Sequence, residues 1–327
     1  MNQSYMNIQK TIAIILFLVF TISLSVVAQK INIPAARSGY AMAYDAGRGV
    51  VVLFGGQDQA NNRLDDTWEW SNGVWKQIAV KGPSARMNAP MAYDAEKKRV
   101  VVFGGRSEAG TENDLWAYDG KSWSKINTSV SPDSRQLAIM AFDKLGSQLV
   151  LFGGMDSNKN AIGDTWILKN DQWKELKDPG PSPRSSACMA YNDGVGAVFI
   201  YGGYVNGKGV NEFWELKDGN WHDMGNQGGP GRIHASISYD QKKDRMLLFG
   251  GFDDQGRTNE LWQYDNGQWT QIPTGSGLTP DTRAEHRSVF IPGKGLFVFG
   301  GVIGPDPNTR NRGNDTWLFD GTTWAKI

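Results

Sequence analysis

Six arginines recur along this chain at a nearly constant spacing: Arg37, Arg86, Arg135, Arg184, Arg232 and Arg283. Each precedes a pair of adjacent glycines by 18 residues, except the last, which precedes its pair by 17. Guanidinium groups that converge on one point form bidentate contacts with carboxylates, sulfates or phosphates. The first hypothesis is therefore a ligand-binding mouth lined by these six side chains.

An acidic residue accompanies each arginine and supports a second interpretation. It stands two positions before a tryptophan in every case: Asp66, Asp114, Asp164, Glu212, Glu260 and Asp315. If the arginine and the acid lie in one sheet, two inter-strand spacings of about 5 Å each separate them, and an extended arginine spans that distance. The arginines then pair within the fold and bind no ligand. The sequence leaves both interpretations open.

The elements that position these residues repeat six times. In each repeat a short apolar run, such as Val100–Phe103, reads as a buried strand that ends at two glycines. The glycine pairs begin at Gly55, Gly104, Gly153, Gly202, Gly250 and Gly300, and each is followed by two tryptophans seven positions apart. A fixed period of this kind means that one supersecondary unit is stacked along the chain.

The repeat resembles the kelch repeat, whose marks are the double glycine and the spaced tryptophan and whose period is about 50 residues. The resemblance covers residues 35–327 and implies an all-β fold, a six-bladed β-propeller of four-stranded antiparallel blades. We expect blades at about 35–80, 81–129, 130–178, 179–226, 227–275 and 276–327. In the second blade we expect strands at Arg86–Tyr93, Arg99–Phe103, Leu115–Tyr118 and Trp123–Ile126.

Both faces of a blade are covered by its neighbours, so the residues of its first strand should be small or apolar. The fifth residue after each arginine fits this, and we predict that the row forms core between blades: Met42, Met91, Met140, Met189, Ile237 and Ser288. The sixth blade has its own last strand, so no strand is obviously borrowed to close the ring. Because Lys30–Pro34 resembles the end of a repeat, we expect it to lie against the outer edge of the last blade.

Strand parity places the arginines and the loops after the glycines on one face of the propeller, here called the top face. These loops vary in length, and variable loops on a rigid scaffold usually carry recognition. In propellers of this family the corresponding loops line the ligand mouth. The resemblance therefore implies an aromatic platform made by Tyr204 and Phe252 for a sugar ring or a peptide side chain. Polar groups of the ligand would be fixed by Arg106, Asp156 and Asp253. The longest loop, Gly301–Asn314, carries Arg310 and Arg312 and is expected to overhang the mouth.

Several kelch propellers are enzymes, and each kind requires particular residues. A copper radical oxidase resembling galactose oxidase needs a cysteine-linked tyrosine, a further tyrosine and two histidine ligands. Cys188, His234 and His286 lie on first strands of consecutive blades, but Cys188 falls in an apolar core pattern. No zinc-ligand spacing or Ser-His-Asp set is evident, so we predict no metal and no cofactor. The resemblance to periplasmic sialic-acid mutarotases leaves one enzymatic alternative, with Glu285, His286 and Arg287 as its catalytic residues.

Residues 1–28 differ in character from the repeats. Lys10 precedes an apolar run, Thr11–Val27, that ends before Ala28, a pattern typical of a secretory signal peptide cleaved after Ala28. The expected location is therefore secreted or periplasmic, with no membrane span after cleavage. Cys188 is the only cysteine, so no intramolecular disulfide forms. The formal net charge of zero argues against a nucleic-acid partner.

These observations together predict an exported kelch propeller that acts as a binding module. Its ligand is a carbohydrate, a peptide or a protein, and the contact surface is the top face. The alternative is a carbohydrate-processing enzyme of the mutarotase kind.

Overall fold

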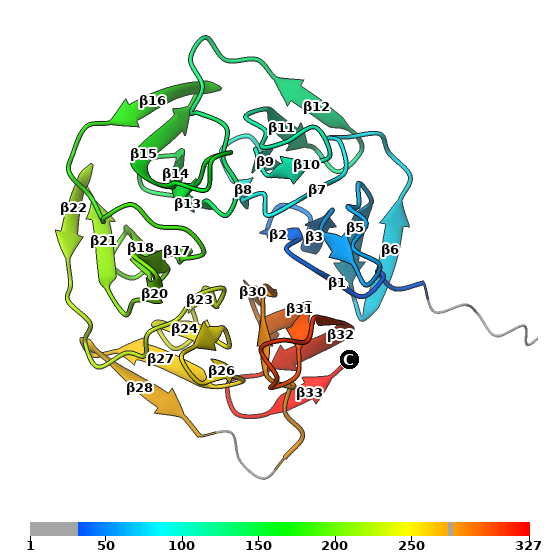
Figure 1. The fold of residues 1–327 in the computed structure, drawn as a ribbon, viewed down its shortest axis with the longest axis vertical. Helices are drawn as coiled ribbons and strands as arrows, with labels where there is room; N and C mark the ends of the chain where they lie inside the picture. The colour runs from blue at the N-terminus through cyan, green and yellow to red at the C-terminus, as the bar shows by residue number, and fades with distance from the viewer. Residues whose placement is uncertain (1–31, 274–276) are drawn as a thin grey trace, which may run out of the picture. The chain divides into compact units, whose positions relative to one another are not determined.

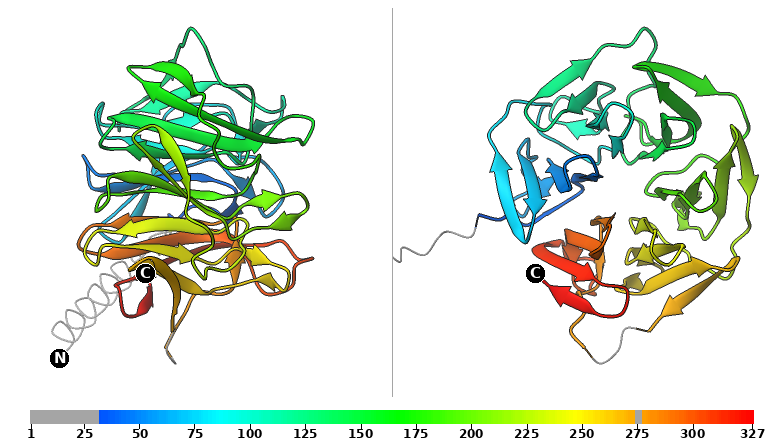
Figure 2. Two further views of the ribbon diagram at one scale, coloured as in Figure 1. Left: turned by 90° about the vertical axis from the view of Figure 1, so that its left-hand side faces the viewer. Right: turned by 180° about the vertical axis from the view of Figure 1, so that it is seen from behind.

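The computed structural model describes residues 32–273 and 277–327, and the unit Pro34–Ile327 is a six-bladed β-propeller (Figure 1). Six antiparallel sheets follow one another around a common axis in chain order, and none of the described residues is helical. The view from behind in Figure 2 shows the same radial arrangement. The predicted all-β fold with four-stranded blades is confirmed.

Each blade places its first strand nearest the axis and its last strand at the periphery (Figure 1). The first blade consists of β2 (Ala41–Asp45), β3 (Val50–Phe54), β5 (Thr67–Ser71) and β6 (Val74–Ile78), and the second of β8 (Met91–Asp94), β9 (Arg99–Phe103), β11 (Leu115–Tyr118) and β12 (Trp123–Ile126). The third blade consists of β13 (Ile139–Asp143), β14 (Gln148–Met155), β15 (Ala161–Lys169) and β16 (Gln172–Leu176), and the fourth of β17 (Cys188–Asn192), β18 (Ala197–Tyr201), β21 (Phe213–Lys217) and β22 (Asn220–Asp223). The fifth blade consists of β23 (Ser236–Asp240), β24 (Arg245–Phe249), β27 (Leu261–Asp265) and β28 (Gln268–Ile272), and the sixth of β30 (Arg287–Ile291), β31 (Gly295–Ile303), β32 (Asn311–Phe319) and β33 (Trp324–Lys326).

Short ribbons on the top face involve the segments that follow the glycine pairs. They are β1 (Arg37–Ser38) with β4 (Gln57–Asp58), β7 (Arg86–Met87) with β10 (Arg106–Ser107), β19 (Tyr204–Val205) with β20 (Lys208–Gly209), β25 (Phe252–Asp253) with β26 (Gly256–Arg257), and β29 (Arg283–Ala284) with β31.

The first predicted strand of the second blade is wrong in one respect. The stretch predicted as a single strand, Arg86–Tyr93, is divided into β7 and β8, and β7 pairs with the top-face strand β10. The break falls at Asn88, whose φ of 58° lies in the left-handed region that no strand can contain. The other three strands of this blade have the predicted bounds.

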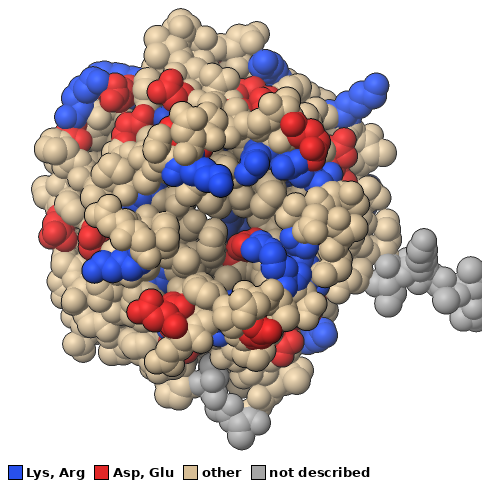
Figure 3. Space-filling model, viewed as in Figure 1, with Lys and Arg blue, Asp and Glu red and all other residues tan. Residues whose placement is uncertain are grey.

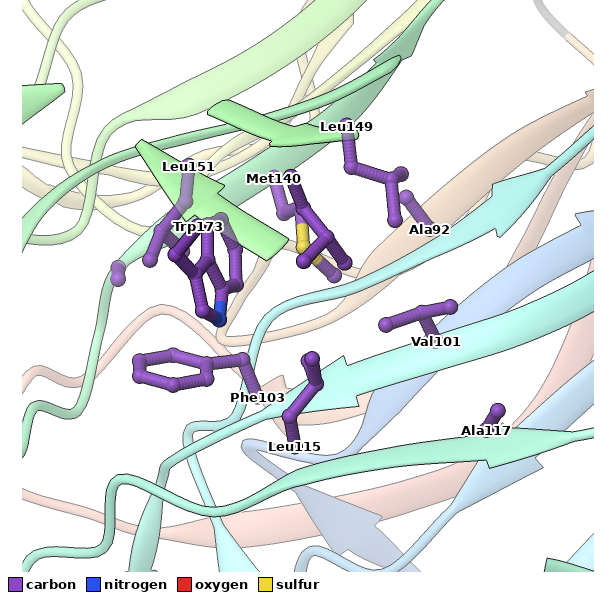
Figure 4. Close-up of a cluster of buried hydrophobic side chains, with 11 residues drawn as sticks. Ala92, Val101, Phe103, Leu115, Ala117, Met140, Leu149, Leu151 and Trp173 are labelled. Carbon is purple, nitrogen blue, oxygen red and sulfur yellow. The ribbon is translucent and has the colours of Figure 1, made fainter. Parts of the chain in front are cut away.

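The hydrophobic core is divided into six clusters, and each cluster lies between two neighbouring blades. Figure 4 shows the cluster between the second and third blades, where Met140 and Trp173 meet residues of β9 and β11. The Trp173 ring lies edge-on to Phe103, with ring centroids 5.4 Å apart, a favourable aromatic geometry. Met140 is 6% exposed, so its predicted place in the core between blades is confirmed.

The ring closes by packing between the first and last blades, because the last blade supplies its own outer strand, β33. Trp75 lies edge-on to Phe299, with ring centroids 5.1 Å apart, and its Nε1 donates to Thr316 Oγ1 at 3.1 Å. The predicted signal peptide, residues 1–28, and the start of the predicted latch, Lys30 and Ile31, lie outside the described residues. Among the residues that are described, none forms a helix with the length and apolarity needed to cross a membrane.

Candidate functional site

Each of the six arginines lies inside its blade and is paired with an acid. Arg135 is fully buried; its Nη2 donates to Asp164 Oδ2 at 2.9 Å, and its Nη1 donates to the other carboxylate oxygen. The same guanidinium donates to the carbonyl oxygens of Gly153 and Asp133 at 3.1 and 3.0 Å. All six pairs recur: Arg37–Asp66, Arg86–Asp114, Arg135–Asp164, Arg184–Glu212, Arg232–Glu260 and Arg283–Asp315.

The acid of each pair also accepts a hydrogen bond from the first tryptophan of its blade, as Asp164 does from Trp166 Nε1 at 2.8 Å. Burial alone raises the pKa of the Asp164 carboxyl, but the hydrogen bonds and charge of Arg135 outweigh burial, and the net pKa is lowered. The structure therefore agrees with the pairing interpretation. A ligand mouth made of the six arginines does not fit it, because each is at most 5% exposed and is bonded to protein.

The glycine pair allows the next blade to approach closely. Gly104 and Gly105 have φ angles of 57° and 92°, which glycine adopts without steric cost. Gly105 N–H donates to Arg135 O at 2.9 Å, and a Cβ atom on Gly104 would lie 2.7 Å from the same oxygen. The arginine of one blade and the glycines of the preceding blade thus form a single joint.

A closed ring of six backbone hydrogen bonds joins the blades on the top face, and we call it the axial ring. Its members stand two positions after the arginines: Gly39, Asn88, Leu137, Ser186, His234 and Glu285. Each N–H donates to the carbonyl of the member in the preceding blade, and Gly39 donates to Glu285 across the closure, at N···O distances of 2.6 to 3.2 Å. All six φ angles lie between 54° and 62°, which is unfavourable for residues other than glycine.

The axial ring was missed by sequence reasoning because Gly39 is its only glycine. The sequence marks the axial ring only by its variety of residue types. The position two residues after the arginine holds six different residue types, whereas the next position is alanine in four of the six repeats. Side chains held in the left-handed region at one rim are candidates for function. His234 is such a residue; its Nε2 lies 3.3 Å from Ser186 Oγ, and burial lowers its pKa.

The two aromatic residues predicted to bind ligand lie on ribbons of successive blades. Tyr204 is 41% exposed, and its backbone pairs with Ser185. Phe252 is half-buried, and its backbone pairs with Ile233. Tyr204 therefore offers aromatic surface on the top face, while Phe252 offers less.

The three polar residues predicted beside them have different surroundings. Asp253 accepts a hydrogen bond from Arg232 Nη1 at 2.6 Å, so its carboxylate is already used. Asp156 accepts the backbone N–H groups of Asn158 and Asn160 at 2.9 and 2.8 Å and shapes its own loop. Arg106 is exposed in β10 and makes no ion pair with a described carboxylate.

The residues of the enzymatic alternative point in different directions. His286 is fully buried; its ring packs edge-on against Phe249 at 5.3 Å, and its Nε2 lies 2.9 Å from Ser236 Oγ. Burial lowers the pKa of His286 well below its usual value. Glu285 instead reaches the top face, where it meets Arg310, and Arg287 lines the central channel. The predicted trio is therefore not assembled around one substrate position.

The β31–β32 loop, Gly304–Arg310, is held in place from both sides. Arg257 Nε donates to Gly304 O at 2.9 Å, which ties the loop to the fifth blade. On the other side, Arg312 Nη2 donates to Gln57 Oε1 at 2.7 Å and to Asn61 Oδ1 at 3.0 Å in the first blade. The loop is thus fixed across the closure of the ring.

One carboxylate lies at the centre of these contacts. Glu285 accepts hydrogen bonds from Arg310 Nη2 at 2.7 and 2.8 Å and from Ser38 Oγ at 2.9 Å. Arg312 Nε donates in turn to Ser38 Oγ at 3.2 Å. Figure 3 shows basic side chains gathered beside the central hollow, over β31 and β32. Arg310 thus bonds this carboxylate directly and Arg312 is linked to it through Ser38, so two arginines share one carboxylate.

Beside the axial ring, the inner strands enclose a cavity of about 410 Å³ along the axis. Its wall includes Pro90, Ile139, Cys188, Ser236 and Arg287, which occupy the same position in five consecutive blades. Its volume lies in the range of small-molecule sites, which is about 300–1,000 Å³.

A ring of six repeated sheets, joined by arginine pairs and glycine pairs, defines a β-propeller built from sequence repeats. The family model described as the KLHDC2/KLHL20/DRC7 Kelch-repeats domain matches residues 5–137. Over these residues the chain is similar to a kelch-repeat domain, and the structure is a six-bladed β-propeller, as the sequence predicts. No curated protein matches the chain. A kelch propeller indicates a protein-binding module.

Proposed function

We propose that this protein binds a protein or peptide ligand on its top face, with the β31–β32 loop and its neighbours as the main contact. The observation that carries the proposal is the fixation of this loop. Arg257 of the fifth blade donates to three carbonyl oxygens of the loop, and Arg312, in β32 just after the loop, donates to Gln57 in the first blade. A loop that is ordered before binding loses less conformational entropy when a ligand arrives.

Electrostatics favour a ligand with negative charge at this place. Burial and then the charge of Arg310 lower the pKa of both Arg257 and Arg312, so the three cations lie near one another. Arg310 is 53% exposed, which leaves most of its guanidinium available to a partner. Complementary charge raises the rate and specificity of association, so an acidic segment is the expected ligand.

Carbohydrate recognition is the second candidate, and the exposed ring of Tyr204 favours it. Aromatic surface on a rigid ribbon suits stacking against a sugar face as well as packing against a peptide side chain. Export of the protein, with cleavage after Ala28, is also part of the proposal, and it rests on the apolar run Thr11–Val27.

A displayed peptide library and a glycan array, each screened against the purified protein, test the proposal. We expect enrichment of acidic peptides whose binding is lost in Arg310→Gln. The matched control is Lys121→Gln, which removes one exposed charge from a turn between the outer strands of the second blade. Peptides lost in the control and kept in Arg310→Gln would refute the assigned face. Selective binding of glycans, lost in Tyr204→Ala, would replace the peptide ligand by a carbohydrate.

A further inference from the structure

One arginine of the described chain differs from the six paired ones, and it lies in the central channel. Arg287 begins β30, four positions after Arg283, and lines the axial cavity. The corresponding residues that line the cavity in other blades are uncharged: Pro90, Ile139, Cys188 and Ser236. A single blade therefore places a permanent positive charge beside otherwise neutral channel walls at this level.

The guanidinium of Arg287 has no acidic partner within ion-pair distance among the described residues. Its side chain makes one hydrogen bond, from Nη1 to its neighbour's carbonyl, His286 O, at 3.2 Å. An arginine has five N–H donors, so most of them remain for another acceptor. The acid two positions before it in the sequence, Glu285, is bonded to Arg310 and Ser38 on the top face.

Such a charge is unusual in a folded protein, because a buried cation without an anion is costly. Burial is the main effect on this guanidinium, and it lowers the pKa of Arg287. The side chain keeps part of its surface exposed while it lines the cavity. A partly exposed cation that faces an accessible cavity, with no acidic partner among the described residues, is available to a ligand.

We propose that Arg287 makes the axial cavity a binding site for a carboxylate. The fork of N–H groups matches the two oxygens of a carboxylate, and the walls of Ile139, Cys188 and Met189 match an apolar stem. The site is separate from the top-face contact, since it lies within the channel and uses none of the residues of the β31–β32 loop.

The axial ring limits what enters from the top face. Hydrogen-bonded neighbours lie about 5 Å apart, so six of them form a hexagon whose corners are about 5 Å from the axis. Atoms with contact distances of about 3.5–4.0 Å leave a narrow opening inside this hexagon. A straight aliphatic acid or an extended acidic side chain fits such an opening, and a sugar ring does not. The cavity also extends toward the other end of the channel, where Tyr93 and Tyr191 line it.

Titration calorimetry of the purified protein with sodium butyrate tests the site. We expect saturable one-to-one binding that is at least tenfold weaker in Arg287→Met, and an intermediate affinity in Arg287→Lys, which keeps the charge without the fork. The control is Lys121→Met, which removes an exposed charge from a turn between the outer strands of the second blade and should bind butyrate like the unmodified protein.

Two results would overturn the proposal. One is unchanged butyrate affinity in Arg287→Met, and the other is no saturable binding of butyrate by the unmodified protein. Thermal unfolding tests whether the substitution damages the fold. Because Arg287 has no acidic partner among the described residues, the melting temperature of Arg287→Met should equal or exceed that of the unmodified protein. A clear fall would show a structural role and count against the site.

Competition identifies the source of the carboxylate. If saturating butyrate displaces an acidic peptide selected on the top face, an acidic group of that peptide enters the channel. If the peptide stays bound, the natural ligand is a small free acid. Loss of peptide binding in Arg310→Gln with butyrate binding intact separates the two sites, so either proposal can fail without the other.

Discussion

Replacing Arg135 with alanine tests the claim that the paired arginines are structural. The change leaves the Asp164 carboxylate without its bidentate partner and leaves the carbonyls of Gly153 and Asp133 without a donor. Breaking a fully buried ion pair costs about 3–5 kcal/mol. Because Asp164 is 25% exposed and regains some hydration, we place the loss of unfolding free energy at the lower end, about 3 kcal/mol. At about 2 °C per kcal/mol for a chain of this size, the melting temperature falls by roughly 6 °C.

The assay is urea unfolding followed by tryptophan fluorescence, with thermal unfolding beside it. Arg106→Ala is the control, because this exposed arginine makes no ion pair with a described carboxylate; its unfolding free energy should change by less than about 0.5 kcal/mol. The double variant Arg135→Met with Asp164→Leu removes both charges and should recover much of the loss. A loss below about 1 kcal/mol in Arg135→Ala, combined with loss of ligand binding, would refute the structural role and restore the arginine mouth.

Four further predictions concern stability and are checked by the same unfolding measurements. Thr165→Val removes the buried acceptor of Trp221 Nε1, which lies 3.0 Å away, and should lower the free energy of unfolding by about 1–3 kcal/mol. Leu115 occupies the position of Thr165 in the second blade and packs in one cluster with Trp173, whose Nε1 has no partner among the described residues. Leu115→Thr offers this Nε1 an acceptor and should therefore cost less than an ordinary polar substitution in the core. Gly104→Ala should cost more than about 2 kcal/mol, since its φ is left-handed and its Cβ would meet a backbone oxygen; a neutral result would contradict the joint between blades. Five paired carboxyls, including Asp164 and Glu212, have a lowered pKa in the folded protein. Their contribution to the free energy of unfolding is therefore complete above the unfolded pKa values of 3.8 for Asp and 4.5 for Glu, and it is lost as the pH falls through the folded pKa values. Stability that rises on acidification through this range would contradict the pairing.

The architecture could be predicted from the sequence because the residues that set it are chemically restricted. Only glycine tolerates the approach of the next blade at Gly104, and the inward rows need small or apolar side chains such as Met140. These restrictions recur with one period, and the number of blades follows from counting them. The pairing of Arg135 with Asp164 also followed from strand spacing, although spacing alone did not exclude a ligand.

The candidate site was harder to predict, because it depends on which neighbours a side chain meets. The left-handed position two residues after each arginine carries asparagine, leucine, serine, histidine and glutamate as well as glycine, so no residue type marks it. The same limit applies to Asp253, which looked available and is bonded to Arg232. It applies in reverse to Arg287, which has no acidic partner among the described residues, and this is visible only when all blades are in place.

The features that distinguish this propeller gather where its ring closes. The position after each axial-ring residue is alanine in four blades and Tyr40 or His286 in the first and last. Tyr40 donates its hydroxyl to Phe299 O and accepts the backbone N–H of Arg287 at 3.0 Å, so it joins the closing blades and also fixes the start of the strand that carries the channel arginine. A ring without a covalent or shared-strand closure needs such contacts, and they bring residues of both chain ends together. A ligand bound across this junction contacts both blades only in the closed ring. Its binding energy therefore adds to the stability of closure, and ligand binding is coupled to the closure of the ring.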